Sequence, residues 1–183
     1  MRITGGALRG RKLKAPRGRA TRPTADMVRK AIFDVLGPSR AMGRVLDLFA
    51  GTGALGLEAL SRGAREVVFV ERRRDALQAL RENVEALGVK EHVRVLPLDV
   101  KKALKVLRDE GASFDLVLLD PPYLRGMAEE ALRQIADSGI LAQGAVVVLE
   151  HSSREAPQPP SGLDLFSRHR YGDTTVSFFS CVA

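Results

Sequence analysis

From residue 44 onward, short runs rich in Val and Leu alternate with longer stretches of helical character. Such nearly continuous apolar runs are typical of strands buried on both faces, and the stretches between them are long enough for crossover helices. The predicted strands cover 44–49, 66–71, 93–99, 114–120 and 145–150. This alternation predicts an α/β fold built on a doubly wound, mostly parallel sheet.

Two more β-like runs follow a linker at 151–162 that contains several Pro and Ser residues. The runs cover 163–171 and 174–182, with Gly172 and Asp173 between them. A two-residue connection of this type predicts an antiparallel hairpin. The sheet is therefore expected to end in antiparallel strands, which an all-parallel dinucleotide-binding fold lacks.

The positive charge of the chain is concentrated at its N-terminus. Residues 1–30 hold ten Lys or Arg and one Asp, whereas the rest of the chain, with 19 basic and 21 acidic residues, is nearly neutral. A dense cationic segment on a neutral body is the expected footprint for a polyphosphate partner such as nucleic acid. A solvated, disordered tail is the alternative interpretation.

The predicted structure of this segment argues against a disordered tail. Glycines and spaced apolar residues over 1–15 suggest short strands or a hairpin. An apolar stripe at helical spacing follows Pro23 and continues to Gly37, where a Gly-Pro pair should end the helix. We therefore expect a basic N-terminal β/α extension over 1–38 and one larger domain over 39–183, which suits a chain of 183 residues.

Several functional classes are excluded or disfavoured by composition. The lone cysteine, Cys181, excludes an intramolecular disulfide and any mechanism that needs two thiols. The three histidines, His92, His151 and His169, lack metal-ligand spacing, so we expect no metal. The sequence shows neither a membrane-spanning apolar run nor a signal peptide. We therefore expect a cytoplasmic protein without a membrane partner, acting as a monomer.

Four carboxylates lie at or near the carboxyl ends of the first four predicted strands: Asp47, Glu71, Asp99 and Asp120. Open α/β sheets bind ligands along this edge. Glu71 is placed to accept hydrogen bonds from ribose hydroxyls, and Asp99 with Val100 could bind an adenine amino group and cover its ring. Four acids in this pattern predict a site for hydroxyls, amines or a cation.

A glycine-rich turn follows the first strand, where Gly51, Gly53 and Gly56 match G-x-G-x-x-G at the start of a helix. The glycines permit a tight turn and a close ligand approach. Asp47 would repel an anionic pyrophosphate there but would favour an ammonium or sulfonium group. A nicotinamide dinucleotide phosphate enzyme stays an alternative, because the arginines at 72–74 could bind a 2′-phosphate.

The motif Asp120-Pro121-Pro122-Tyr123 follows the fourth strand. Two prolines remove backbone donors, so nearby carbonyls are predicted to stay free to face a cleft. The Asp120 carboxylate and a proline carbonyl could orient the hydrogens of a planar exocyclic amine, with Tyr123 stacked on its ring. This arrangement would help a poorly nucleophilic nitrogen to present its lone pair.

These motifs together resemble a known family. VLDLFAGTG, Glu71, Asp99 and LLDPPY resemble the class I S-adenosylmethionine-dependent methyltransferases that act on exocyclic amines, which have a Rossmann-like sheet. RITGGALRGRKL followed by RPTADMVRKAIFDVL is similar to the RsmD family, which methylates the N2 amine of a guanine in 16S rRNA. The resemblance covers nearly the whole chain.

The resemblance implies S-adenosylmethionine as cofactor and 16S rRNA, or an assembling small ribosomal subunit, as partner. The implied cofactor-binding residues are Asp47, Ala50, Gly51, Gly53, Glu71, Arg72, Asp99 and Val100. The implied catalytic residues, which would hold the guanine, are Asp120, Pro121, Pro122 and Tyr123. The residues expected to contact RNA phosphates are Arg2, Arg9, Arg11, Lys12, Arg19 and Arg22.

Three alternatives stay open at this point. Similar Pro-Pro-aromatic motifs serve enzymes that methylate DNA adenine or a protein glutamine amide. A DNA enzyme would be expected to carry a separate sequence-reading domain, for which 183 residues leave little room. An oxidoreductase that binds the phosphorylated dinucleotide and an RNA-binding factor with a degenerate site are the rivals from other classes.

Overall fold

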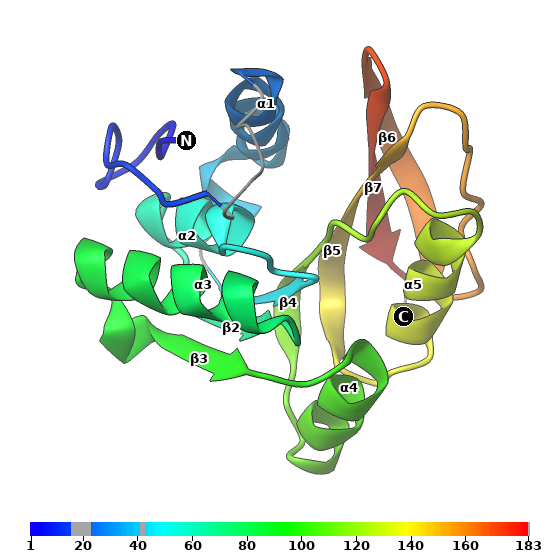
Figure 1. The fold of residues 1–183 in the computed structure, drawn as a ribbon. Helices are drawn as coiled ribbons and strands as arrows, with labels where there is room; N and C mark the ends of the chain where they lie inside the picture. The colour runs from blue at the N-terminus through cyan, green and yellow to red at the C-terminus, as the bar shows by residue number, and fades with distance from the viewer. Residues whose placement is uncertain (16–22, 41–42, 183) are drawn as a thin grey trace.

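The computed structural model describes residues 1–15, 23–40 and 43–182. Its centre is a seven-stranded sheet with the order β3-β2-β1-β4-β5-β7-β6, visible in Figure 1. The strands are β1 (Arg44–Leu48), β2 (Glu66–Val70), β3 (Val93–Leu96), β4 (Phe114–Leu119), β5 (Leu141–Ser152), β6 (Leu163–Tyr171) and β7 (Thr174–Cys181). Strands β1 to β5 run parallel, and β7 is antiparallel to both of its neighbours. The predicted doubly wound α/β fold with a C-terminal antiparallel hairpin is confirmed.

Helices cover both faces of the sheet. They are α1 (Pro23–Arg40), α2 (Ala54–Ser61), α3 (Arg74–Leu87), α4 (Val100–Asp109) and α5 (Met127–Ala136), with a short 3-10 turn at Lys90–His92. Apolar residues of α1, α2 and α3 share one hydrophobic cluster with one face of the sheet. Residues of α4 and α5 share a second cluster with the opposite face. The core therefore consists of two apolar layers separated by the sheet, and Figure 1 shows helices on both sides of the sheet.

Two strand boundaries differ from the sequence prediction by three or more residues, and the other strand ends differ by no more than two. Strand β3 ends at Leu96 and does not continue to residue 99, because Pro97 has no N–H for the ladder and Asp99 already caps α4. Strand β5 begins at Leu141, before the predicted 145–150 run, and its first residues pair irregularly with β4.

The N-terminal extension is a compact loop closed by one antiparallel bridge between Arg2 and Lys12, so the predicted hairpin is reduced to a single pairing. Its apolar residues Ile3 and Leu13 are buried in the cluster of α1 to α3. Gly6 has a φ of 79°, and a Cβ built there would lie 1.9 Å from the Ser61 carbonyl oxygen. The loop thus packs closely on the end of α2.

Helix α1, which follows the N-terminal loop within the predicted 1–38 extension, leads to the first strand of the sheet. Gly37 is non-helical, with φ 72° and ψ 168°, so the regular helix stops where the Gly-Pro pair predicted. Of the predicted apolar stripe, Val28, Ile32 and Leu36 are buried, whereas Val35 is exposed and lies outside the buried face. The division into 1–38 and 39–183 stays a prediction, although both parts contribute to one hydrophobic cluster.

A buried carboxylate joins the extension to α1 and α2. Glu58 of α2 has no exposed surface. Its oxygens accept hydrogen bonds from the backbone N–H groups of Thr4 and Gly5 at 2.9 and 3.0 Å. They also accept from the Nε groups of Arg29 and Arg62 at 3.0 and 2.9 Å. Four donors from three parts of the chain therefore converge on one side chain.

We expect Glu58→Gln to lower the free energy of unfolding by up to about 3 to 5 kcal/mol, because the buried Arg29 loses its fully buried anionic partner and keeps only the partly exposed Asp26. Urea unfolding followed by circular dichroism measures the change. Glu66→Gln is the matched control, since Glu66 pairs with Arg44 at a partly exposed site and should cost under about 1 kcal/mol. Equal effects of the two substitutions would contradict the role of Glu58.

Candidate active site at the carboxyl edge of the sheet

The glycine-rich turn connects β1 to α2 and has the backbone that its sequence predicts. Gly51 and Gly53 have φ values of 58° and 88°, in the left-handed region that favours glycine. Gly56 packs against β2, where an added Cβ would lie 2.4 Å from Phe69 Cε1. A Cβ on Gly51 would meet nothing within 4 Å, so the outer side of the turn is open to a ligand.

Asp47 lies below this turn rather than at its surface. It belongs to β1, is 1% exposed, and its Oδ2 accepts a 2.9 Å hydrogen bond from the Gly56 N–H. Burial, partly offset by that bond and reinforced by the charge of Glu71, raises the pKa of Asp47 to about 7. The carboxyl therefore fixes the start of α2, and its contact with a cofactor stays a prediction.

Glu71 follows β2 and faces the same turn. One carboxylate oxygen accepts from the Gly51 N–H at 2.8 Å, and the other accepts from the N–H groups of Arg72 and Arg73, both at 2.9 Å. The residue is half-buried, and Oε2, which accepts only the Gly51 N–H, can accept one further donor. Glu71 thus ties the glycine turn to the start of α3 while part of it stays open to a ligand.

The remaining predicted cofactor residues lie along the same edge. Asp99 caps α4 by accepting a 2.9 Å hydrogen bond from the Lys102 N–H, and Val100 begins that helix. Both are half-buried. Ala50 is buried, with its N–H bonded to a β2 carbonyl, whereas Arg72 is exposed. The predicted cofactor residues therefore all come from the first three strand ends.

The Asp-Pro-Pro-Tyr motif follows β4, next to β1 at the centre of the sheet. Pro121 is buried and Pro122 is exposed. The expectation that nearby carbonyls stay free is wrong for Pro122, whose oxygen accepts a 2.7 Å hydrogen bond from the Leu124 N–H in a tight local turn. Proline removes its own donor but cannot prevent a later residue from donating back. The Pro121 carbonyl receives no such bond within the described residues.

Tyr123 is held at the rim of the site. Its side chain is 49% exposed, and its hydroxyl forms a 2.9 Å hydrogen bond with Thr174 Oγ1 at the start of β7. The bond connects the motif to the C-terminal hairpin and limits how far the ring can move. An exposed, tethered aromatic ring of this kind can serve as a stacking platform.

A carboxylate that the sequence interpretation missed, Glu150 of β5, lies beside Asp120. Burial and the charges of Glu150 and Asp47 raise the pKa of Asp120 well above its usual range. Asp120 nevertheless keeps exposed surface, so solvent softens this rise and a ligand can reach the carboxyl. Burial likewise raises the pKa of Glu150 to about 6, against the attraction of Arg29. The signal was present, because the fifth predicted run also ends in an acid.

The basic residues of the extension have different surroundings. Arg9 and Lys12 are exposed and form no ion pair within the described part of the chain. Arg2 donates to the Gly10 carbonyl, and Arg11 donates at 2.6 Å to the Ala86 carbonyl near the end of α3. Arg19 and Arg22, also predicted to contact RNA, lie outside the described residues.

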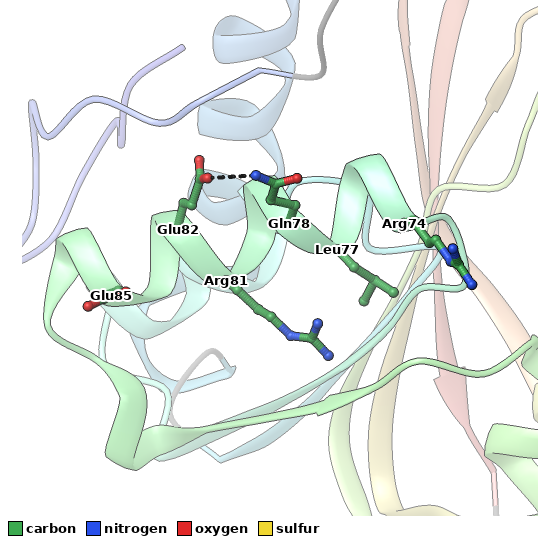
Figure 2. A pocket seen from close by; sticks show the side chains of 6 residues that line it. All are labelled: Arg74, Leu77, Gln78, Arg81, Glu82 and Glu85. Atoms are coloured by element: carbon green, nitrogen blue, oxygen red, sulfur yellow. Dashed lines mark hydrogen bonds between the residues drawn. The ribbon is translucent and has the colours of Figure 1, made fainter.

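A cavity of about 420 Å³ opens elsewhere, on the outer face of α3 (Figure 2). It is lined by Arg74, Leu77, Gln78, Arg81, Glu82 and Glu85. The only bond drawn there joins Gln78 to Glu82 at 3.2 Å. Its walls carry mixed charge and come from one helix, so the strand-end cluster is the stronger candidate for chemistry.

Solved structures share this architecture. A candidate methyltransferase of Escherichia coli, yhhF, is 36% identical, with a TM-score of 0.85 over 100% of this chain and 98% of that one. The Thermus thermophilus 16S rRNA N2 methyltransferase RsmC, solved in complex with AdoMet and guanosine, is 26% identical. Its TM-score is 0.65, over 91% of this chain and 45% of that chain. The fold is that of the class I methyltransferases.

Sequence relatives define the family more closely. The family model described as Conserved hypothetical protein 95 matches residues 1–180. The Escherichia coli ribosomal RNA small subunit methyltransferase D is 40% identical over 150 residues, which cover 82% of this chain and 74% of that protein. A candidate rRNA methyltransferase of Bacillus subtilis, YlbH, is 37% identical over 98% of both chains. The chain belongs to the RsmD family.

The described residues contain neither a membrane-spanning helix nor a metal-binding cluster. No helix there is long and apolar enough to cross a membrane. No group of three or more His, Cys, Asp or Glu side chains in that part of the chain is placed to hold a metal ion.

The raised pKa of Asp47 predicts a pH dependence of stability. The folded state binds this proton more tightly than the unfolded chain, whose Asp pKa is about 4. The resulting contribution is fully present below about pH 4 and is lost as the pH rises through about 7. We expect the free energy of unfolding of the native protein to fall over this window relative to that of Asp47→Asn, by at most about 1.4 kcal/mol per pH unit.

Urea unfolding at several pH values between 4 and 8 would measure this difference. Asp164→Asn is the control, because Asp164 is an exposed carboxylate on β6 and should leave the pH slope unchanged. Parallel curves for the native protein and Asp47→Asn would show that Asp47 titrates normally.

Proposed function

We propose that this protein transfers a methyl group from S-adenosylmethionine to the exocyclic N2 amine of a guanine in 16S rRNA. The observation that carries the proposal is the Asp-Pro-Pro-Tyr motif at the central strand end, beside the glycine turn of β1. Family membership supports the reaction class, since the related Escherichia coli protein is named as a small subunit rRNA methyltransferase. The RsmC neighbour supports guanosine as the acceptor, because its structure contains AdoMet and guanosine.

The strand-end residues fit the cofactor. The left-handed turn is open at Gly51, which allows close approach of the methionine part, whereas Gly53 packs against Leu80. Glu71 Oε2 retains acceptor capacity for a ribose hydroxyl, and Asp99 with Val100 lies at the next strand end, where the adenine would be bound. When bound, S-adenosylmethionine supplies an activated methyl group, so positioning provides much of the remaining catalysis.

The residues after β4 orient the acceptor. The Asp120 carboxylate and the Pro121 carbonyl accept the two N2 hydrogens, and Tyr123 stacks on the guanine ring. This directs the nitrogen lone pair toward the methyl group. Asp120, whose pKa is raised by its surroundings, then takes the proton that the methylated amine must release. Since the amine must leave the base stack to reach this edge, the target lies in a loop or unpaired RNA segment.

The N-terminal extension supplies the attraction for RNA in this proposal. Arg9 and Lys12, exposed and without ion pairs in the described chain, are the cations best placed for phosphates. Residues 1–38 would then act as an RNA-binding unit and 39–183 as the methyltransferase domain. One chain contains every group that the reaction uses, so it would act as a monomer on rRNA or an assembling small subunit in the cytoplasm.

We expect Asp120→Asn to lower the single-turnover rate of methyl transfer by about a hundred- to a thousandfold. The amide keeps the shape of the carboxylate but presents an NH2 group to the N2 amine in the wrong polarity. The substrate is rRNA or small subunits from a strain that lacks this protein, and mass mapping of modified nucleosides identifies the base and its position. Methylation of an adenine, or of no RNA, would overturn the proposed function.

Glu71→Gln is the matched control, because it changes a carboxylate at the cofactor part of the edge. Calorimetry with S-adenosylhomocysteine should show nearly native affinity for Asp120→Asn and a loss of about tenfold or more for Glu71→Gln. A near-native transfer rate for Asp120→Asn would remove its amine-orienting role. Binding of NADP in place of S-adenosylhomocysteine would favour the oxidoreductase alternative.

A second experiment tests the extension. Replacing Arg9 and Lys12 by Gln should weaken RNA binding irrespective of sequence and should flatten the plot of log K against log salt by about 1.5. Lys101 and Lys105 of α4, exposed on the other layer of the molecule, are the charge-matched control and should leave the slope unchanged. Equal slopes for all three proteins would show that the extension does not bind phosphates.

A further inference from the structure

Glu150 is fixed beside Asp120 by the pairing of the strands. In the parallel ladder of β4 and β5, Leu118 pairs with Val148 and Leu119 with Leu149. Continuing that register one residue beyond the end of β4 would place Asp120 opposite Glu150, and the effect of the Glu150 charge on Asp120 agrees with this placement. Residues paired across adjacent strands have Cβ atoms about 5 Å apart and point to the same face. Two carboxylates therefore stand side by side where the proposed guanine site begins.

The pairing of β5 with β7 shows toward which face of the sheet Glu150 points. In the antiparallel ladder of β5 and β7, Glu150 pairs with Val176. Val176 and Val148 both belong to the cluster under α1 to α3. Glu150 therefore points to the α1 side of the sheet, the same side as Asp47, whose charge also acts on Asp120. Strand geometry thus brings three carboxylates to one side of the central strand ends.

Glu150 has no hydrogen bond or ion pair with any described residue, although it is only partly exposed. Arg29 attracts it from α1, but the guanidinium of Arg29 is bonded to Glu58 and Asp26. No buried side-chain oxygen of the described residues lacks a hydrogen-bond partner, so the Glu150 oxygens reach water, and a ligand that displaces this water must offset the cost of desolvating the carboxylate. Donors from a ligand would offset that cost, and burial that excludes water would strengthen such hydrogen bonds.

We propose that Glu150 is a specificity-determining residue that accepts the N1–H of the target guanine while Asp120 holds the neighbouring N2 amine. This inference rests on the proposed guanine-N2 reaction. Guanine presents N1–H and N2–H2 side by side on its Watson–Crick edge, which matches two adjacent carboxylates. Adenine has a bare acceptor at N1, which Glu150 would repel. The pair of carboxylates therefore selects guanine by the polarity of its edge.

The base analogue 2-aminopurine tests this role, because it keeps an amine at position 2 but has an unprotonated acceptor at N1. The substrates are two synthetic RNA fragments around the mapped target, one with guanine and one with 2-aminopurine at that position. We expect the native protein to methylate the guanine RNA faster. In Glu150→Gln, whose amide can donate to N1, this preference should fall about ten- to hundredfold.

The ratio of the methylation rates on the two RNAs distinguishes a loss of base recognition from a folding defect. A structural defect in Glu150→Gln would slow both RNAs equally and leave the preference unchanged, which would overturn the proposal. Asp164→Asn removes an exposed carboxylate from the same sheet and should leave both rates and the preference at native values. Glu150→Asp, which retains the acceptor, should recover part of the guanine preference.

The affinity for free nucleosides tests the role of Glu150 independently of the methylation rates. The fluorescence of 2-aminopurine riboside, added with S-adenosylhomocysteine, should report tighter binding to Glu150→Gln than to the native protein, and guanosine should compete less well on the variant. Unchanged affinities for both nucleosides would overturn the role of Glu150. If the native protein methylates neither RNA and binds neither nucleoside, the proposed guanine function itself fails, which is a distinct outcome.

Discussion

The buried carboxylate of Glu58 is the interaction on which the arrangement of the molecule depends. It lies on α2, the helix that the glycine turn begins, and it receives donors from the N-terminal extension, from α1 and from α2 itself. A carboxylate with no exposed surface is tolerated only when charged and neutral donors surround it. The same helix therefore sets both the glycine turn and the basic loop, which places the proposed RNA contacts at a fixed position relative to the cofactor residues.

At the carboxyl ends of the strands, unlike around Glu58, acidic side chains lie close to one another. Asp47, Asp120 and Glu150 gather there with raised pKa values, caused first by burial and, for Asp47 and Asp120, also by neighbouring negative charge. Like charges held together lower the stability of the folded protein, and such arrangements concentrate at functional sites. A cationic sulfonium and the N–H donors of a guanine would both relieve this repulsion. The edge is thus complementary to the proposed ligands before either binds.

Local sequence patterns were sufficient for the strands, because a parallel strand buried on both faces leaves a continuous apolar run such as residues 114–119. The end of β3 was misjudged, since Pro97 stops the ladder inside an otherwise apolar run. The roles of Glu58 and Glu150 could not be predicted locally. Glu58 has the appearance of an exposed helical residue, and its partners Thr4 and Gly5 lie more than 50 positions away. Glu150 gains its neighbour only through strand order and register.

The antiparallel hairpin at the end of the sheet contributes directly to the proposed base site. Its strand β7 provides Val176 opposite Glu150 and Thr174 as the hydrogen-bond partner of Tyr123. One element thus supports both the stacking platform and the second carboxylate, while β4 supplies Asp120. Side chains supported by strand ladders hold their positions better than side chains on loops alone. The antiparallel hairpin, which an all-parallel dinucleotide-binding sheet lacks, therefore also supports the proposed acceptor site.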